Sequence, residues 1–122
     1  MALKINLKDG DSVYFGTSKV TAVQDGGYIV LVVDGADLPI MRASEVISLE
    51  HADTAYKRIY YHLQQYYLER SPEQLEIAEA FAGSLNDEER DVVLSVILQV
   101  AKGQTFKGLR LMRGIAGIRS EN

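Results

Sequence analysis

The N-terminal part of the chain alternates apolar and polar positions in short runs, as half-buried β-strands do. Leu3, Ile5 and Leu7 are separated by polar residues, which is the period-two pattern of a strand with one buried face. Further runs rich in β-branched and aromatic residues lie between glycine-containing turns, at 12–15, 19–23, 28–33 and 38–41. Pro39 favours an edge position for the last of them. We therefore expect a small five-stranded antiparallel β module over residues 1–50, arranged as a barrel or meander.

From residue 51 the apolar period changes to three and four residues, which is typical of amphipathic helices. Tyr60, Leu63 and Tyr67 recur at this spacing in the first helical segment. The pattern continues almost to the end of the chain and predicts a C-terminal bundle of three to four helices. The expected fold class is therefore α+β, with a β module over 1–50 and a helical module over 51–122.

Polar residues and glycines indicate where the helices begin and end. Either Asp53 or Thr54 is expected to cap the first helical segment, and the stretch Asn86-Asp87-Glu88-Glu89 is expected to cap the third. The stretch Ser71-Pro72-Glu73-Gln74 has the form of a capping box, in which the Ser71 hydroxyl accepts from the backbone of Gln74 and the Gln74 side chain reaches back. Gly83 is expected to end the helix that begins there.

Residues 92–101 are apolar on almost every side and rich in β-branched residues. A buried strand is one interpretation, but the acidic cap before the segment and the glycine after it favour a helix. A helix that is apolar all round is buried on two sides, by its own domain or by a partner subunit. We therefore expect a homo-oligomer. Val93, Ile97, Tyr60 and Tyr67 are the expected protein-interface positions.

The composition is that of a soluble protein, expected in the cytoplasm, without metal or catalytic chemistry. Of the 122 residues 47% are apolar and 25% are charged. No run approaches the roughly 18–20 apolar residues of a membrane span, and no secretory signal is evident. There is no cysteine, and His51 and His62 do not have the spacing of two metal ligands on one helical face. We expect no cofactor, no metal and no enzymatic activity, because phosphate-binding and nucleophile motifs are absent.

The net charge of −4 argues against a protein that attracts nucleic acid in bulk, but the cations are unevenly distributed. Between residues 102 and 120 there are five basic residues and no acid. On the last predicted helix the basic positions fall three apart, at Lys107, Arg110 and Arg113. The apolar positions on its other side are Phe106, Leu109, Met112 and Ile115. This cationic row is either a site for phosphates or an ordinary solvated face.

Tyrosines are also concentrated, since five of the seven lie between residues 56 and 67. Exposed aromatic side chains can stack on unpaired bases of RNA. At helical spacing, however, such a stripe is more often part of a core or of a protein interface. Both interpretations remain open from the sequence alone.

Three segments carry a resemblance to a known family. Residues 1–11 form a short basic and apolar strand that ends in the turn Lys-Asp-Gly-Asp, residues 38–47 read Leu-Pro-Ile-Met-Arg-Ala-Ser-Glu-Val-Ile, and residues 54–60 read Thr-Ala-Tyr-Lys-Arg-Ile-Tyr. In this order and spacing the chain resembles the FlbT family of bacterial flagellar regulators over nearly its whole length. The resemblance implies a post-transcriptional regulator of flagellin synthesis that binds the 5′ leader of flagellin mRNA and alters its translation or stability. The alternative is a protein-interaction adaptor or chaperone-like factor that binds flagellin or another flagellar protein.

The order of the strands and turns in the β module also resembles the CsrA family of small RNA-binding β proteins. In that family an arginine after the last strand and basic residues on the first strand contact RNA loops. Arg42 and Lys8 occupy the matching positions here, although Met41 and Asp9 depart from the family's pattern. The expected RNA-binding residues are therefore Lys8, Arg42, Lys107, Arg110 and Arg113.

Overall fold

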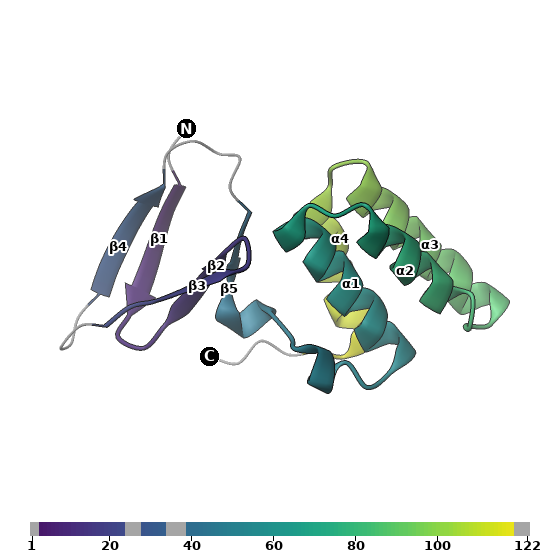
Figure 1. The fold of residues 1–122 in the computed structure, drawn as a ribbon. Coiled ribbons are helices and arrows are strands. Elements are labelled where there is room, and N and C mark those ends of the chain that lie inside the picture. Colours follow the sequence, from purple (N-terminus) through teal and green to yellow (C-terminus); the bar gives the residue numbers. More distant parts are fainter. Residues whose placement is uncertain (1–2, 24–27, 34–38, 119–122) are drawn as a thin grey trace.

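The computed structural model describes residues 3–23, 28–33 and 39–118. Figure 1 shows a β part beside a helical part. The strands are β1 (Leu3–Lys8), β2 (Ser12–Phe15), β3 (Ser18–Thr21), β4 (Tyr28–Val33) and β5 (Ile40–Arg42). They form a two-stranded sheet β1–β4 and a three-stranded sheet β3–β2–β5, both antiparallel. The expected α+β class with five antiparallel strands is confirmed.

The alternation in β1 places side chains as the sequence predicts. Ile5 and Leu7 are buried, whereas Lys4, Asn6 and Lys8 are exposed. The small core of the β part also contains Val13 and Ala22, with Phe15, Leu31 and Ile40 packed against it. The third and fifth strands differ from the expected bounds. Strand β3 runs from Ser18 to Thr21, and β5 starts after Pro39 and extends to Arg42, while residue 38 lies outside the described residues.

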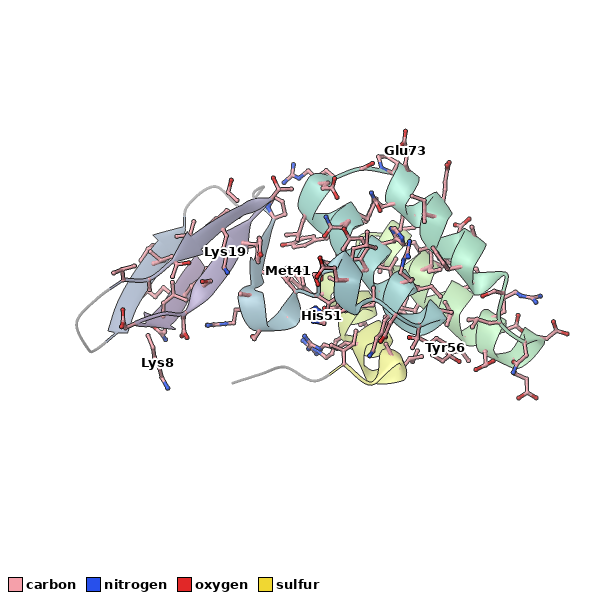
Figure 2. All side chains as sticks on the ribbon, turned by 60° about the horizontal axis from the view of Figure 1, so that its bottom comes forward. Lys8, Lys19, Met41, His51, Tyr56 and Glu73 are labelled. Atoms are coloured by element: carbon pink, nitrogen blue, oxygen red, sulfur yellow. The ribbon has the colours of Figure 1, made fainter. Side chains whose placement is uncertain are left out.

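The strand β5 connects two separate hydrophobic cores, because its neighbouring residues point to opposite faces. Ile40 packs against the core of the β part, whereas Met41 is buried in the core of the helical part (Figure 2). On the adjacent strand, Tyr14 pairs with Met41 and packs against the helical core as well. The sheet β3–β2–β5 therefore has one face toward each core. The division of the chain into modules at residue 50 stays a prediction.

Four α-helices follow two short 3₁₀ turns. The turns are η1 (Ala43–Glu45) and η2 (Leu49–His51), and the helices are α1 (Ala55–Glu69), α2 (Glu73–Ala82), α3 (Asp87–Ala101) and α4 (Thr105–Ala116). Thr54 and Asn86 cap α1 and α3 by accepting from the backbone of Lys57 at 3.1 Å and of Glu89 at 2.9 Å. Within the described ranges, no helix is both long and apolar enough to span a membrane.

The predicted capping box at the start of α2 is wrong. The backbone N–H of Gln74 donates to the carbonyl of Ser71 at 3.1 Å, and the helix has no side-chain cap. The Gln74 side chain instead meets His62 of α1, with 2.7 Å between Oε1 and Nδ1. Gln74 therefore holds α2 against α1, and this tertiary partner outcompetes the local motif.

The segment 92–101 is helical, as the flanking residues indicate, but it is buried on one side within the chain. Val93, Val96, Ile97 and Val100 face the helical core. On the opposite side the apolar Leu98 is 53% exposed. The described residues therefore leave the second side of this helix uncovered.

Helices α3 and α4 approach closely at Gly108, and this contact generates a prediction about stability. A Cβ atom at this buried glycine would overlap Cγ2 of the buried Val100. Overpacking costs about 1–3 kcal/mol, against which the better helix propensity of alanine regains up to about 1 kcal/mol. We expect Gly108→Ala to lower the free energy of unfolding in urea by about 1–2 kcal/mol.

Gly114 offers the matched control in the same helix, because a Cβ atom there would meet no atom within 4 Å. We expect Gly114→Ala to raise the free energy of unfolding by about 0.5–1 kcal/mol. Equal effects of the two substitutions would contradict the close packing of α3 on α4.

Candidate functional site

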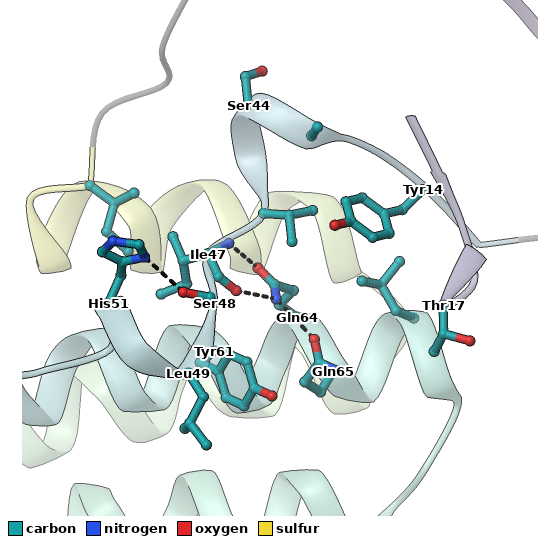
Figure 3. Close-up of a pocket in the computed structure, with 14 residues that line it drawn as sticks. Tyr14, Thr17, Ser44, Ile47, Ser48, Leu49, His51, Tyr61, Gln64 and Gln65 are labelled. Atoms are coloured by element: carbon teal, nitrogen blue, oxygen red, sulfur yellow. Dashed lines mark hydrogen bonds between the residues drawn. The ribbon is translucent and has the colours of Figure 1, made fainter. Parts of the chain in front are cut away.

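A row of three side chains on α1 holds the segment that leads from the sheet into the helices. Tyr60, Gln64 and Tyr67 are spaced four and three residues apart and therefore share one face of the helix. We call them the polar row of α1. Their partners are backbone groups in residues 40–47, a stretch that we call the connecting segment. Figure 3 shows the part of this contact around Gln64.

Each member of the polar row bonds to a different point of the connecting segment. The Tyr60 hydroxyl donates to the carbonyl of Glu45 at 2.6 Å. Gln64 accepts from the N–H of Ile47 at 2.8 Å and donates to its carbonyl at 2.9 Å. The remaining bonds join Tyr67 to Ile40: the hydroxyl accepts from the N–H at 2.9 Å and lies 3.3 Å from the carbonyl. Tyr60 and Gln64 are fully buried, and their bonds to the connecting segment are partly buried.

Burial keeps the two phenols of the polar row in their neutral form. Burial raises the pKa of Tyr60 to about 12, and the guanidinium of Arg113 opposes this rise. Arg113 also pairs with Glu45, with 3.8 Å between Nη1 and Oε2. Burial likewise raises the pKa of Tyr67. The phenols therefore stay neutral and act as hydrogen-bonding groups.

An open cleft of about 650 Å³ lies beside the connecting segment (Figure 3). Its lining comes from β2 and the turn after it, from most of residues 43–51, from α1 and from Ile118. The described lining residues carry hydroxyl, amide, imidazole and apolar groups, without a carboxylate or an amine. Ser48 Oγ and His51 Nδ1 are 2.7 Å apart at its edge, but no acid among these residues orients the imidazole as in a hydrolase triad.

The described residues contain no group of three His, Asp or Glu side chains that could hold a metal ion. His62, which could in principle bind a metal ion, instead contacts side chains of α2. Its ring stacks on Phe81 with centroids 5.7 Å apart, and its Nδ1 faces Gln74. The histidine therefore lies in the contact between α1 and α2.

The five predicted RNA-binding cations occupy three different environments. Lys107 and Arg110 are exposed on α4. Arg113, on the same helix, is only 21% exposed and is paired with Glu45, so it supports the connecting segment. In the β part, Arg42 is exposed with Nη1 3.4 Å from the carbonyl of Asn6, and Lys8 is exposed at the end of β1.

Three of the four predicted protein-interface residues are buried within the single chain. Tyr60, Val93 and Ile97 are buried in the helical core of the single chain. Tyr67 is half-buried, bonds to Ile40, and meets the ring of Phe106 edge-on with centroids 5.0 Å apart. Helical spacing identified buried positions correctly, but their neighbours belong to the same chain.

Sequence reasoning missed Gln64 and the role of Glu45. Gln64 lies four residues after Tyr60 and three before Tyr67, so its place on the tyrosine face was visible from spacing alone. The sequence places Phe106 on the apolar side of the last helix, yet it is 51% exposed beside Lys107. The mixed face of α4, aromatic and cationic together, was therefore not foreseen.

Comparison with known protein families gives a match over nearly the whole chain. The family model described as "Flagellar protein FlbT" matches residues 3–121. The chain belongs to the FlbT family. This membership covers both the β part and the helical part, so the polar row and its partners lie within the family match.

Two curated FlbT relatives show the extent of the similarity. A protein of Rhodopseudomonas palustris strain TIE-1, named probable flagellum biosynthesis repressor protein FlbT, is 27% identical over 117 residues, which cover 93% of this chain and 90% of the relative. A protein of Bradyrhizobium diazoefficiens, named probable flagellum biosynthesis repressor protein FlbT 1, is 32% identical over 73 residues, or 60% of this chain, and the match spans 49% of that relative. No solved structure matches the chain. These names support a regulatory role in flagellar synthesis.

The buried amide of Gln64 gives a prediction about how the connecting segment is held. Gln64→Leu leaves the N–H and the carbonyl of Ile47 without their amide partner, and each such group costs about 1–3 kcal/mol. We expect the free energy of unfolding to fall by about 2–4 kcal/mol. Gln99→Leu is the control, because Gln99 Oε1 is buried without a hydrogen-bond partner among the described residues. If both variants unfold at the same urea concentration, the amide does not hold the segment.

The raised pKa of Tyr60 predicts a loss of stability at high pH. The pKa of Tyr60 is about 12 in the folded protein and about 10 in the unfolded chain. The difference contributes its full stabilisation to the fold below pH 10. As the pH rises through this window, the unfolded chain loses its proton first, and the stability falls by about 2–3 kcal/mol by pH 12. Urea unfolding of the protein and of Tyr60→Phe at pH 8, 10 and 11 measures this effect, and the variant should lose less stability over the range.

Tyr66→Phe is the control, since the Tyr66 hydroxyl forms no hydrogen bond with another described residue. This variant should keep the pH dependence of the unaltered protein. The same slope in all three proteins would show that Tyr60 does not titrate at higher pH on folding.

Proposed function

We propose that this protein is a cytoplasmic post-transcriptional regulator of flagellin synthesis that binds the 5′ leader of flagellin mRNA. Membership of the FlbT family and the repressor names of its relatives support a role in flagellar regulation. The resemblance of the β module to RNA-binding β proteins supports RNA as the ligand. Repression then follows if the bound leader is withheld from ribosomes or exposed to nucleases.

The observation that carries this proposal is the exposed face of α4. Phe106, Lys107 and Arg110 are exposed there, in the stretch from 102 to 120 that contains no acid. Cations of this kind neutralise phosphates, and an exposed aromatic ring stacks on an unpaired base. A single-stranded leader offers both groups. We name Phe106, Lys107 and Arg110 the α4 face.

A second contact, on the β part, would make the protein prefer one RNA sequence over another. Arg42 follows the last strand, and its guanidinium lies near the β1 backbone at Asn6. From this position it can reach a base edge or sugar of an RNA loop, and Lys8 on β1 adds a cation to the same part of the protein. Arg113 is not among the proposed RNA contacts, because it is paired with Glu45.

A protein-interaction adaptor is the second candidate, and a separate observation favours it. Val92 of α3 and Leu111 of α4 are large apolar side chains that are 55% and 43% exposed. Such side chains fit a protein partner, such as flagellin or another flagellar protein, better than they fit RNA. The two candidates differ in their dependence on salt, because phosphate contacts are weakened by counterions.

The test measures affinity for a flagellin leader and for an unrelated RNA of equal length at several salt concentrations around 0.15 M. Lys107→Glu with Arg110→Glu should weaken binding to both RNAs and reduce the salt slope by about 0.7 for each phosphate that is no longer neutralised. Arg42→Ala should instead reduce the preference for the leader by about 1–3 kcal/mol.

Lys19→Glu is the control for a single charge reversal, to be compared with Lys107→Glu alone, because Lys19 is exposed on β3 away from the α4 face. It should change the salt slope by less than the α4 variants do. The RNA proposal fails if the protein binds the leader no more tightly than the unrelated RNA. Retention of a flagellar protein in the same experiment would then support the adaptor.

A further inference from the structure

A stripe of four exposed residues runs along the outer side of α3. Asp91, Ser95, Leu98 and Lys102 are spaced four, three and four residues apart, so they follow one line on the helix surface over about 16 Å. All four are exposed, and α3 lies at the end of the helical part that is remote from the strands (Figure 1). We call these residues the α3 stripe.

The charges at the two ends of the α3 stripe are opposite and have no ionic partner in the described structure. Asp91 lies near the N-terminal end of α3, and Lys102 forms its C-terminal cap. The ion pairs of the described residues involve neither of them. Between the two charges lie Leu98, which is 53% exposed, and the small Ser95.

This order of residues is complementary to itself when a second copy runs in the opposite direction. The midpoint between Asp91 and Lys102 along the helix is also the midpoint between Ser95 and Leu98. A two-fold axis at that point therefore places Asp91 opposite the Lys102 of the second copy, and Leu98 opposite its Ser95, each pair occurring twice. A small residue facing a large one lets the two helices approach closely.

Parallel pairing of the same stripe is disfavoured. It would bring Asp91 against Asp91 and Lys102 against Lys102, and it would align the two helix dipoles. The antiparallel arrangement reverses both effects. We infer that the outer side of α3 is the contact for a second copy of this chain, in a two-fold antiparallel helix pair centred between Ser95 and Leu98.

This inference does not rest on the proposed function, since the α3 stripe and the α4 face share no residue. The pair joins the helical parts and leaves the strands of both copies at its outer ends. A dimer of this kind displays two copies of Arg42 and of the α4 face. A long single-stranded ligand that reaches both copies would be held more tightly than by either copy alone.

Sedimentation or light scattering over a series of protein concentrations tests the contact. The unaltered protein should dimerise, and Leu98→Glu should raise the dissociation constant at least about tenfold because it places two carboxylates near the axis. Its monomer should unfold at an unchanged temperature, since residue 98 is exposed in the single chain. Ile77→Glu is the control, because it introduces the same change at an exposed apolar residue of α2 and should leave the dimer intact.

A charge exchange tests the direction and the register. Asp91→Lys and Lys102→Asp should each weaken the dimer about tenfold, and the double variant should return within about threefold of the unaltered protein. Glu76→Lys, at an exposed acid of α2, controls for the change in net charge.

Three results would overturn the inference. The first is a protein that stays monomeric up to about 100 μM, a concentration at which even weak specific dimers form. The second is a dimer that Leu98→Glu and both single charge reversals leave intact. The third is a double variant no better than the single ones, which rules out the antiparallel pairing of Asp91 with Lys102. Loss of another protein's binding in Leu98→Glu, with no change in mass, would assign the stripe to that partner instead.

Discussion

The hydrogen bonds between the polar row of α1 and the backbone of the connecting segment determine how the two parts of this protein meet. A chain that leaves a sheet and has not yet entered a helix carries backbone groups without regular partners, and burying them is costly. Tyr60, Gln64 and Tyr67 supply those partners from one helical face. The position of β5, the shape of the cleft and the direction in which α1 leaves the sheet follow from this contact.

The same contact also sorts the cations of α4 into two groups. Arg113 forms an ion pair with Glu45 of the connecting segment, whereas Lys107 and Arg110 are exposed to solvent. Three basic residues that look equivalent along the sequence therefore have different roles. Spacing shows which residues share a helix face, but the acid that engages one of them lies in a segment that only the fold brings near.

Local patterns predicted most of the fold because they depend on neighbouring residues alone. Alternation in β1, the presence of side-chain caps at the starts of α1 and α3, and the helical nature of 92–101 could all be derived in this way. Failures occurred where a distant partner competes. Gln74 had the sequence of a capping residue but pairs with His62, and the apolar face containing Val93 and Ile97 was assigned to a partner although the chain's own helices cover it. Sequence periodicity reveals that a face is buried and does not reveal what buries it.

The placement of Ile40 and Met41 in different cores restricts how the sequence can change in length. In a strand, inserting or deleting one residue turns every following side chain to the opposite face. Within β5 this would move Met41 out of the helical core and Ile40 out of the β core in a single step. Loops elsewhere in the chain can lengthen or shorten without such an effect. We therefore expect related chains to differ in length on either side of this three-residue strand and to preserve its register.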